Sequence, residues 1–434
     1  MSLTFANDNE PTTLISRTIE LTGTAADTAL FSVLPRQDAV AWVRHGEGLV
    51  GWGRTARIAT TGHNRFSQAA QWWRDLSKRA IVRDEVDLPG TGPIAFGTFA
   101  FAADSAAEST LVVPRYVLGR KGETTWLTVI STDARIEPTP DLTELNKREL
   151  EPVASPGAVE FRPGAVPPSQ WRDIVKDAIG RIENHDLDKV VMARDVIATA
   201  EKDVDPRWLL TQLAEDYPSC WTFHVRGIVG ATPELLVRRE KGLVTSRVLA
   251  GTIRRTGNDE RDMAHAATLA RSSKDLEEHE YSVRSIADIF DPYCASMNVP
   301  DAPFVLHLPN VMHLASDVTG VLKPDGEANS SLELAADLHP SAAVCGTPTP
   351  LAKAVISEIE GMDRDRYAGP VGWIDAEGDG EWGIALRSAV MDDQDPRKLR
   401  LFAGCGIVAA SDPQTELAES EAKLQPMRQA LSEH

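Results

Sequence analysis

A lysine stands directly beside a run of three apolar residues in the stretch DKVVMARDV, residues 188–196. Val190, Val191 and Met192 form the kind of short apolar run that is typical of a buried strand. Lysine is among the side chains least often buried, so Lys189 either reaches water from the strand end or has a chemical role inside the protein. Taken alone, the stretch favours the first interpretation. A fold for this chain therefore has to place a lysine at the start of a buried strand.

Short strands with glycine turns and a few amphipathic helices account for most of the remaining pattern. The spacing of apolar residues predicts strands at 39–54, 93–101, 114–132 and 220–252, and helices at 65–80, 171–186, 206–218 and 262–294. Residues 137–169 are rich in proline and charge, which predicts a surface connection.

Charge and cysteine usage narrow the possible functions. The chain carries 45 basic and 64 acidic residues, a net charge of −19, so nucleic acid and anionic membranes are poor partners. An anionic substrate would need local cations to hold it. The four cysteines form no C-x-x-C pair, the first residues are polar, and we find no apolar run of about 18 residues. We therefore expect a cytoplasmic protein without membrane segments.

Lys189 and Glu234 are candidates for acid–base chemistry. Glu234 lies in GATPELLV, directly after a proline in a glycine-rich strand context. By itself it is an ordinary edge carboxylate. A buried lysine and a buried glutamate that meet in one site would form an acid–base pair.

A second group of candidates is acidic. Asp275 and Glu278 lie in SSKDLEEHE, and Glu416 and Glu419 lie in TELAESEAK, both with helical spacing. Such runs most often belong to solvated helix surfaces. If the two segments converge, their hard oxygen ligands indicate Mg²⁺ rather than Zn²⁺.

A third group could hold an anion. The backbone N–H groups of Gly404, Cys405 and Gly406 in LFAGCGIVAAS could cradle a carboxylate, although an ordinary glycine turn fits equally. Arg387 lies in IALRSAV, an expected apolar strand, where a bidentate carboxylate is its natural partner. His313 in VMHLAS is by itself a structural histidine.

The combination of these stretches is more specific than any one of them. From about residue 170 to 430 the chain resembles the chorismate-utilising enzymes, which include isochorismate, salicylate and anthranilate synthases. The stretches that carry the resemblance, in order, are DKVVMARD, GATPELLV, VLAGTIRR, SKDLEEHE, VMHLAS, HPSAAVCGTP, YAGPVGWID, ALRSAV, LFAGCGIVAASDP and ELAESEAKL.

The resemblance implies an α+β fold like that of anthranilate synthase component I, with large antiparallel sheets packed together and helices outside. It favours one domain over 1–434, in which 1–150 is the variable N-terminal part and 170–430 the motif-bearing catalytic part. It also implies chorismate as substrate. In the isochorismate and salicylate branches, a lysine at the position of Lys189 activates the water that attacks C2. A glutamate at the position of Glu234 protonates the departing C4 hydroxyl, so we expect the pKa of Glu234 to be raised.

The resemblance also implies the surrounding site. Glu278 and Glu419 match Mg²⁺ ligands, with Asp275 and Glu416 behind them or joined to the metal through water. The positions that match substrate-binding residues are Arg387 and Tyr367 at the enolpyruvyl carboxylate, the backbone of Gly404, Cys405 and Gly406 beside them, and Thr252, His313, Thr347 and Lys423 around the ring. Cys405 departs from the alanine that is frequent at its position, but it is equally small.

Three alternatives remain for the function. The favoured one is an isochorismate synthase of menaquinone or catechol siderophore biosynthesis, because VMHLAS is closer to that branch. The second is a salicylate synthase, which would go on to eliminate pyruvate. The third is a catalytically silent binding protein, against which the presence of Lys189, Glu234, Glu278 and Glu419 together argues. We expect the protein to act as a monomer.

Overall fold

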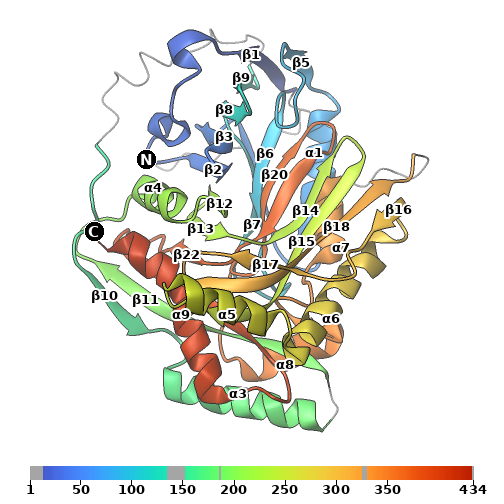
Figure 1. Cartoon of the computed structure of the whole chain (residues 1–434). Helices are drawn as coiled ribbons and strands as arrows, with labels where there is room; N and C mark the ends of the chain where they lie inside the picture. Colours follow the sequence, from blue (N-terminus) through green and yellow to red (C-terminus); the bar gives the residue numbers. More distant parts are fainter. Residues whose placement is uncertain (1–12, 134–151, 185–186, 325–329, 433–434) are drawn as a thin grey trace.

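Two large β-sheets pack together in the computed structural model of the chain, with helices on their outer sides (Figure 1). The structure describes residues 13–133, 152–184, 187–324 and 330–432. The described strand pairs are antiparallel except for β1 with β5. The predicted fold class of packed antiparallel sheets with outer helices is therefore confirmed.

The larger sheet has 13 strands among the described residues, and β19 (Gly346–Thr347) pairs with β11 beside the main row. In spatial order the row is β10 (Val159–Pro163), β11 (Lys189–Ala200), β23 (Lys398–Ile407), β22 (Ser388–Met391), β13 (Ile228–Thr232), β12 (Trp221–Val225), β2 (Ala39–Arg44), β3 (Glu47–Trp52), β8 (Tyr116–Lys121), β9 (Thr124–Ser131), β1 (Ile15–Glu20) and β5 (Ile81–Asp84).

The smaller sheet has 10 strands in the same part of the chain, and β17 (Phe304–His307) pairs with β18. Its row is β16 (Cys294–Asn298), β18 (Val311–Leu322), β15 (Leu243–Arg254), β14 (Leu235–Glu240), β21 (Gly380–Ile384), β20 (Pro370–Asp375), β6 (Ile94–Thr98), β7 (Ser109–Val113) and β4 (Ala56–Thr60). The N-terminal part thus contributes strands to both sheets, while the predicted domain boundaries stay a prediction.

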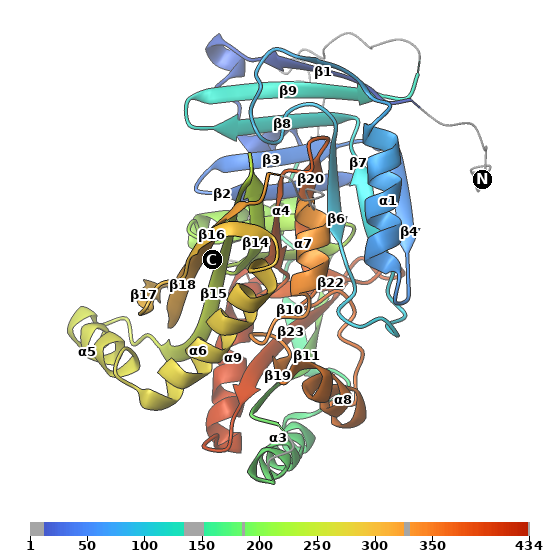
Figure 2. The ribbon, with the colours of Figure 1, turned by 90° about the vertical axis from the view of Figure 1, so that its right-hand side faces the viewer.

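Helices cover both sheets (Figures 1 and 2). Those near the larger sheet are α3 (Pro168–Glu183), α4 (Pro206–Asp216), α8 (Thr349–Ile359) and α9 (Pro413–Leu431). Those near the smaller sheet are α1 (Arg65–Ser77), α5 (Asp259–Leu269), α6 (Ser273–Phe290) and α7 (Ser331–Leu338). Among the described residues, none of these helices has the length and apolar character to span a bilayer.

Three of the predicted helices are confirmed, but the fourth is wrong in detail. The segment predicted as one helix at 262–294 forms two, α5 and α6, and its last residue, Cys294, begins β16. The break occurs because the Ser272 hydroxyl accepts a hydrogen bond from the Asp275 N–H at 3.3 Å and starts a new helix.

The connection predicted at 137–169 is also corrected in part. Residues 137–151 lie outside the described part of the chain, whereas 159–163 form β10 and α3 begins at Pro168. β10 is an edge strand that ends at Pro163. Proline has no N–H, and it is tolerated in an edge strand because no further strand needs that donor.

The strands alternate between two cores. In β2, Val40 and Trp42 belong to the core that joins the two sheets, while Ala41 and Val43 belong to the core shared with α4 and α9. Successive side chains of a strand point to opposite faces, so a strand covered on both sides has no polar face. This explains why the central strands are apolar throughout.

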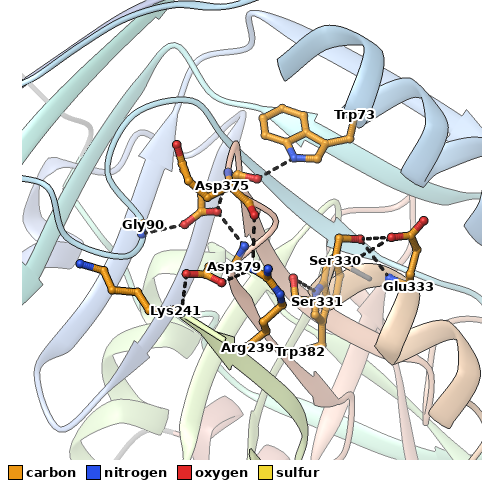
Figure 3. Close-up of polar contacts among 11 residues, drawn as sticks. Trp73, Gly90, Arg239, Lys241, Ser330, Ser331, Glu333, Asp375, Asp379 and Trp382 are labelled. Carbon is orange, nitrogen blue, oxygen red and sulfur yellow. Dashed lines mark hydrogen bonds and ion pairs between the residues drawn. The ribbon is translucent and has the colours of Figure 1, made fainter. Parts of the chain in front are cut away.

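The β20–β21 hairpin leads directly to the loop that contains Arg387, and polar contacts fix its turn (Figure 3). The backbone carbonyl of Asp375 accepts a hydrogen bond from Trp73 Nε1 at 2.8 Å. Its buried carboxylate accepts one from the Asp379 N–H at 2.8 Å, and Asp379 is paired with Arg239. Burial raises the pKa of Asp375 well above its usual range. The turn is therefore tied to α1 and to β14.

Replacing Gly372 in β20 by alanine should destabilise the protein. The new Cβ would lie 1.9 Å from the backbone oxygen of Glu381 on β21, so the hairpin would have to open. We expect a loss of about 1–3 kcal/mol in the free energy of unfolding, measured by urea denaturation. Gly180→Ala in α3 is the matched control, since its Cβ meets no atom within 4 Å and should stabilise the helix by about 0.5–1 kcal/mol. Equal effects would contradict this account.

Candidate active site

A cavity of about 240 Å³ collects most of the residues singled out from the sequence. Strands of both sheets and the helices α6 and α9 contribute to its wall. The predicted site residues that line it are Glu234, Thr252, Asp275, Glu278, His313, Tyr367, Arg387, Gly404, Gly406, Glu416, Glu419 and Lys423. Segments far apart in the sequence therefore meet in one place.

Lys189 begins β11 and is buried, with an exposed fraction of 1%. Its ammonium group lies 2.8 Å from Oε1 of Glu278 on α6. Lys189 does not line the cavity itself, but it borders it through Glu278 and Gly406. The lysine is thus an interior residue held by a carboxylate, rather than a strand-end lysine that reaches water.

Glu234 follows β13 and precedes β14, and its side chain lines the cavity. Burial raises the pKa of Glu234 to about 8, against the opposing influence of the positive charges of Lys189, Lys423 and Arg387. The shift has the direction expected for a carboxyl group that donates a proton. A glutamate with this pKa keeps its proton at neutral pH, beside three cations.

The predicted metal-binding carboxylates also line this cavity. Glu278 and Asp275 come from α6, while Glu419 and Glu416 come from α9, and all four line the cavity. Four hard oxygen donors around one cavity suit Mg²⁺. The residues present therefore fit the implied metal.

Lys423 and Cys405 border this carboxylate group. Lys423 Nζ lies 2.7 Å from Glu419 Oε1 and donates to the Gly404 carbonyl at 2.9 Å. Burial disfavours its charge, but Glu419 holds the pKa of Lys423 above its usual range. Cys405 Sγ lies close to the carboxylates of Glu416 and Glu419 but outside the cavity wall. Burial raises the pKa of the Cys405 thiol well above its usual range, and its Sγ donates to the backbone carbonyl of Glu416.

Arg387 occupies a loop, which corrects the strand predicted for it. It lies between β21 and β22 with a φ of 48°, uncommon for any residue but glycine. Its Nη2 donates to His313 Nε2 at 3.1 Å, and Nδ1 of that ring lies 3.0 Å from Thr252 Oγ1. Burial and the nearby Arg387 charge hold the pKa of His313 well below its usual value. His313 is therefore neutral and fixes the guanidinium group at the cavity.

The predicted anion cradle at Gly404–Gly406 is not formed by a turn. These residues lie within β23, paired with β11, and successive N–H groups of a strand point to opposite sides. The N–H groups of Gly404 and Gly406 therefore point to one side of the strand and that of Cys405 to the other, so the role of this backbone in holding a carboxylate stays a prediction. The glycines also provide space, because a Cβ on Gly406 would lie 2.7 Å from Glu278 Oε1 and 2.9 Å from Lys189 Cε.

Thr347 and Tyr367 support the site in different ways. Thr347 does not line the cavity, but it pairs with Lys189 in the register of β19 and β11. Tyr367 lines the cavity and stacks on Phe402 with ring centroids 5.0 Å apart. Burial raises the pKa of Tyr367 to about 12, so its hydroxyl keeps its proton.

The sequence reasoning missed a buried ion pair between Glu360 and Arg364. Arg364 donates to the Val191 carbonyl at 2.7 Å, and Glu360 accepts from the Ala193 N–H at 2.7 Å. Both contacts fall on β11, and Arg364 also lines the cavity. The spacing of the two charges, i and i+4, was a signal in the sequence, but it is also typical of exposed helices.

Comparison with known proteins assigns this arrangement to a family. The chain matches the family described as chorismate binding enzyme over residues 3–432. It belongs to that family. The match includes both the motif-bearing part and the N-terminal part, for which the sequence offered no motif.

Relatives of this chorismate binding enzyme extend over most of its length. Isochorismate synthase MenF of Bacillus subtilis is 32% identical over 406 residues, 88% of this chain and 85% of that protein. Isochorismate synthase DhbC of the same organism is 38% identical over 275 residues, 61% of this chain and 68% of that protein.

Solved structures share the fold. The putative 2,3-dihydroxybenzoate-specific isochorismate synthase DhbC from Bacillus anthracis superposes with a TM-score of 0.75 at 31% identity, over 93% of this chain and 98% of that one. Anthranilate synthase component I from Streptococcus pneumoniae reaches 0.68 at 22% identity, over 87% and 91%. The predicted likeness to the component I fold is confirmed.

The buried Glu234 should make stability depend on pH. The unfolded chain loses this proton near pH 4.5, whereas the folded protein keeps it to about pH 8, so the free energy of unfolding should fall across that range. Glu234→Gln removes this dependence. As pH rises, the free energy of unfolding of the variant minus that of the wild type should increase by up to about 1.4 kcal/mol per pH unit and then level off. Urea unfolding of both proteins from about pH 5 to pH 8 measures it, and parallel stability curves would contradict the raised pKa.

Proposed function

We propose that the protein is an Mg²⁺-dependent isochorismate synthase, which converts chorismate to isochorismate by attack of water at C2 and loss of the C4 hydroxyl. One observation carries the proposal. Glu234, Glu278 and Glu419 line a single cavity, and Lys189 borders that cavity through its ion pair with Glu278. The names of the relatives support the same activity.

Glu234 acts as the acid in this proposal. A hydroxyl leaves more easily when a proton reaches its oxygen in the transition state. With a pKa of about 8, Glu234 carries that proton at neutral pH. Its buried position also keeps bulk water from delivering protons in its place.

Lys189 acts as the base that takes a proton from the attacking water. Its fixed place at the start of β11 allows it to select one water and one direction of attack. Its ammonium group lies 2.8 Å from Glu278 Oε1. Lys189 must therefore leave this carboxylate, and give up its own proton, before it can act.

Cations hold the two carboxylates of the substrate. Mg²⁺ on Glu278 and Glu419 would bind the C1 carboxylate and offset the acidic charge of the chain. Arg387, fixed by His313, and the hydroxyl of Tyr367 would bind the enolpyruvyl carboxylate. These local cations would attract an anionic substrate in spite of the net charge of −19 of the chain.

The named relatives favour isochorismate over the alternative salicylate as final product. Their names include a vibriobactin-specific enzyme and a menaquinone-specific one, so both proposed pathways stay open. Cytoplasmic location and a monomeric state stay predictions of the sequence.

Incubation with chorismate and Mg²⁺ should yield isochorismate, separated from salicylate by chromatography. Lys189→Ala should lower kcat by about 10²–10⁴-fold, the usual contribution of a general base. Lys189→Arg should be nearly as inactive, because a guanidinium keeps its proton.

The arginine variant is the control that separates the two possible roles of Lys189. It preserves the positive charge but cannot accept a proton. If Lys189→Arg retained most of the wild-type kcat, the residue would supply charge only, and water activation would belong elsewhere.

Metal removal tests the carboxylate site. EDTA should abolish turnover, and added Mg²⁺ should restore it. Glu278→Gln should lose most activity at moderate Mg²⁺ concentrations because one charged ligand is gone. Exposed Glu277 on the same helix provides the control, and Glu277→Gln should behave as the wild type. Full activity in metal-free buffer would refute the Mg²⁺ assignment.

A further inference from the structure

A lysine holds each of the two carboxylates assigned to the metal. Lys189 Nζ lies 2.8 Å from Glu278 Oε1, and Lys423 Nζ lies 2.7 Å from Glu419 Oε1. One pair joins β11 to α6, and the other lies within α9. A lysine–carboxylate contact is thus formed at two separate places beside the cavity.

The Lys189–Glu278 pair is largely shielded from water, and the Lys423–Glu419 pair is partly shielded. The side chains of Lys189 and Glu278 are 1% and 14% exposed, and those of Lys423 and Glu419 are 16% and 27% exposed. Water and salt weaken a pair less in such surroundings than on an open surface. Each contact therefore opposes any other cation that seeks the same carboxylate.

The charges of the two lysines together equal that of one divalent cation. From this we infer that Lys189 and Lys423 are internal stand-ins for the metal, so that Mg²⁺ enters the site by displacing both ammonium groups from Glu278 and Glu419. This inference rests on the proposed Mg²⁺ site and adds to it a competition between the metal and the protein's own lysines.

The displaced lysines have different destinations. Lys423 also donates to the Gly404 carbonyl at 2.9 Å, so it keeps a partner when it leaves Glu419. Lys189 already fills the space that a side chain on Gly406 would need, and Gly406 lines the cavity, so Lys189 would leave Glu278 toward that cavity. Metal entry would thus free the Lys189 amine for water in the cavity. Loading of the metal and exposure of the base become one event.

Metal affinity without substrate tests the inference. The metal-free full chain is titrated with Mg²⁺ by calorimetry, and Mn²⁺ binding is followed by electron paramagnetic resonance. Lys189→Met and Lys423→Met remove one competitor each while keeping side-chain length. Each variant should lower the dissociation constant for the metal by at least about fivefold, which is the lower end of the range by which one bound group usually changes the affinity for another. Lys189→Arg retains a competing charge and should bind no more tightly than the wild type.

Arg387→Gln separates displacement from a general effect of charge. Arg387 is a buried cation of the same cavity, but its guanidinium donates to His313 rather than to a metal carboxylate. Its loss should tighten metal binding less than either methionine variant does. Circular dichroism confirms that each variant is folded.

The possible failures are distinct. Unchanged or weaker metal binding in both methionine variants would overturn the displacement and leave the Mg²⁺ site intact. Equal tightening by Arg387→Gln would also overturn it, because charge alone would then explain the effect. If neither the wild type nor any variant bound the metal saturably, the proposed Mg²⁺ site would fail, and the stand-in role would fail with it.

Discussion

The ion pair between Lys189 and Glu278 is the contact on which the arrangement of the site depends. A lysine this deeply buried requires an anionic partner, since an isolated buried charge is very unfavourable. The partner comes from α6, so the helix must lie close to the start of β11. Gly251 allows this approach from the other side, because a Cβ there would lie 3.0 Å from the Asp275 side chain. The requirement of Lys189 for an anionic partner thus keeps α6 close to β11 of the larger sheet, and Gly251 lets it lie close to β15 of the smaller sheet.

Opposed environments separate the roles of the charged groups in the cavity. Glu234 is buried, and desolvation dominates its pKa. Lys423 is buried too, but the adjacent Glu419 outweighs desolvation. His313 stays neutral beside Arg387. One cavity can therefore hold a protonated acid, a protonated amine and a neutral imidazole at the same pH.

The sequence predicted the parts that depend on local pattern, and the fold through family resemblance. Alternation and helical spacing located β2, β3, α1, α3 and α4. That Glu278 and Glu419 line one cavity depends on contacts between distant segments, so the residues alone favoured a solvated helix surface. The loop at Arg387 was missed because its neighbours are apolar. The space that the Gly404–Gly406 glycines provide was missed because it depends on side chains from β11 and α6.

The clamp of Glu360 and Arg364 on β11 has a further consequence for how the site is specified. Beyond β19, the Val191 N–H donates to the backbone carbonyl of Cys345, while the Val191 carbonyl and the Ala193 N–H are bound by the side chains of Arg364 and Glu360. A strand edge paired only with backbone could shift by one residue and keep its hydrogen bonds, but every side chain would then change face. A paired carboxylate and guanidinium recognise one donor and one acceptor at fixed positions. The clamp therefore selects the register of β11, and with it the face of the sheet on which the lysine appears.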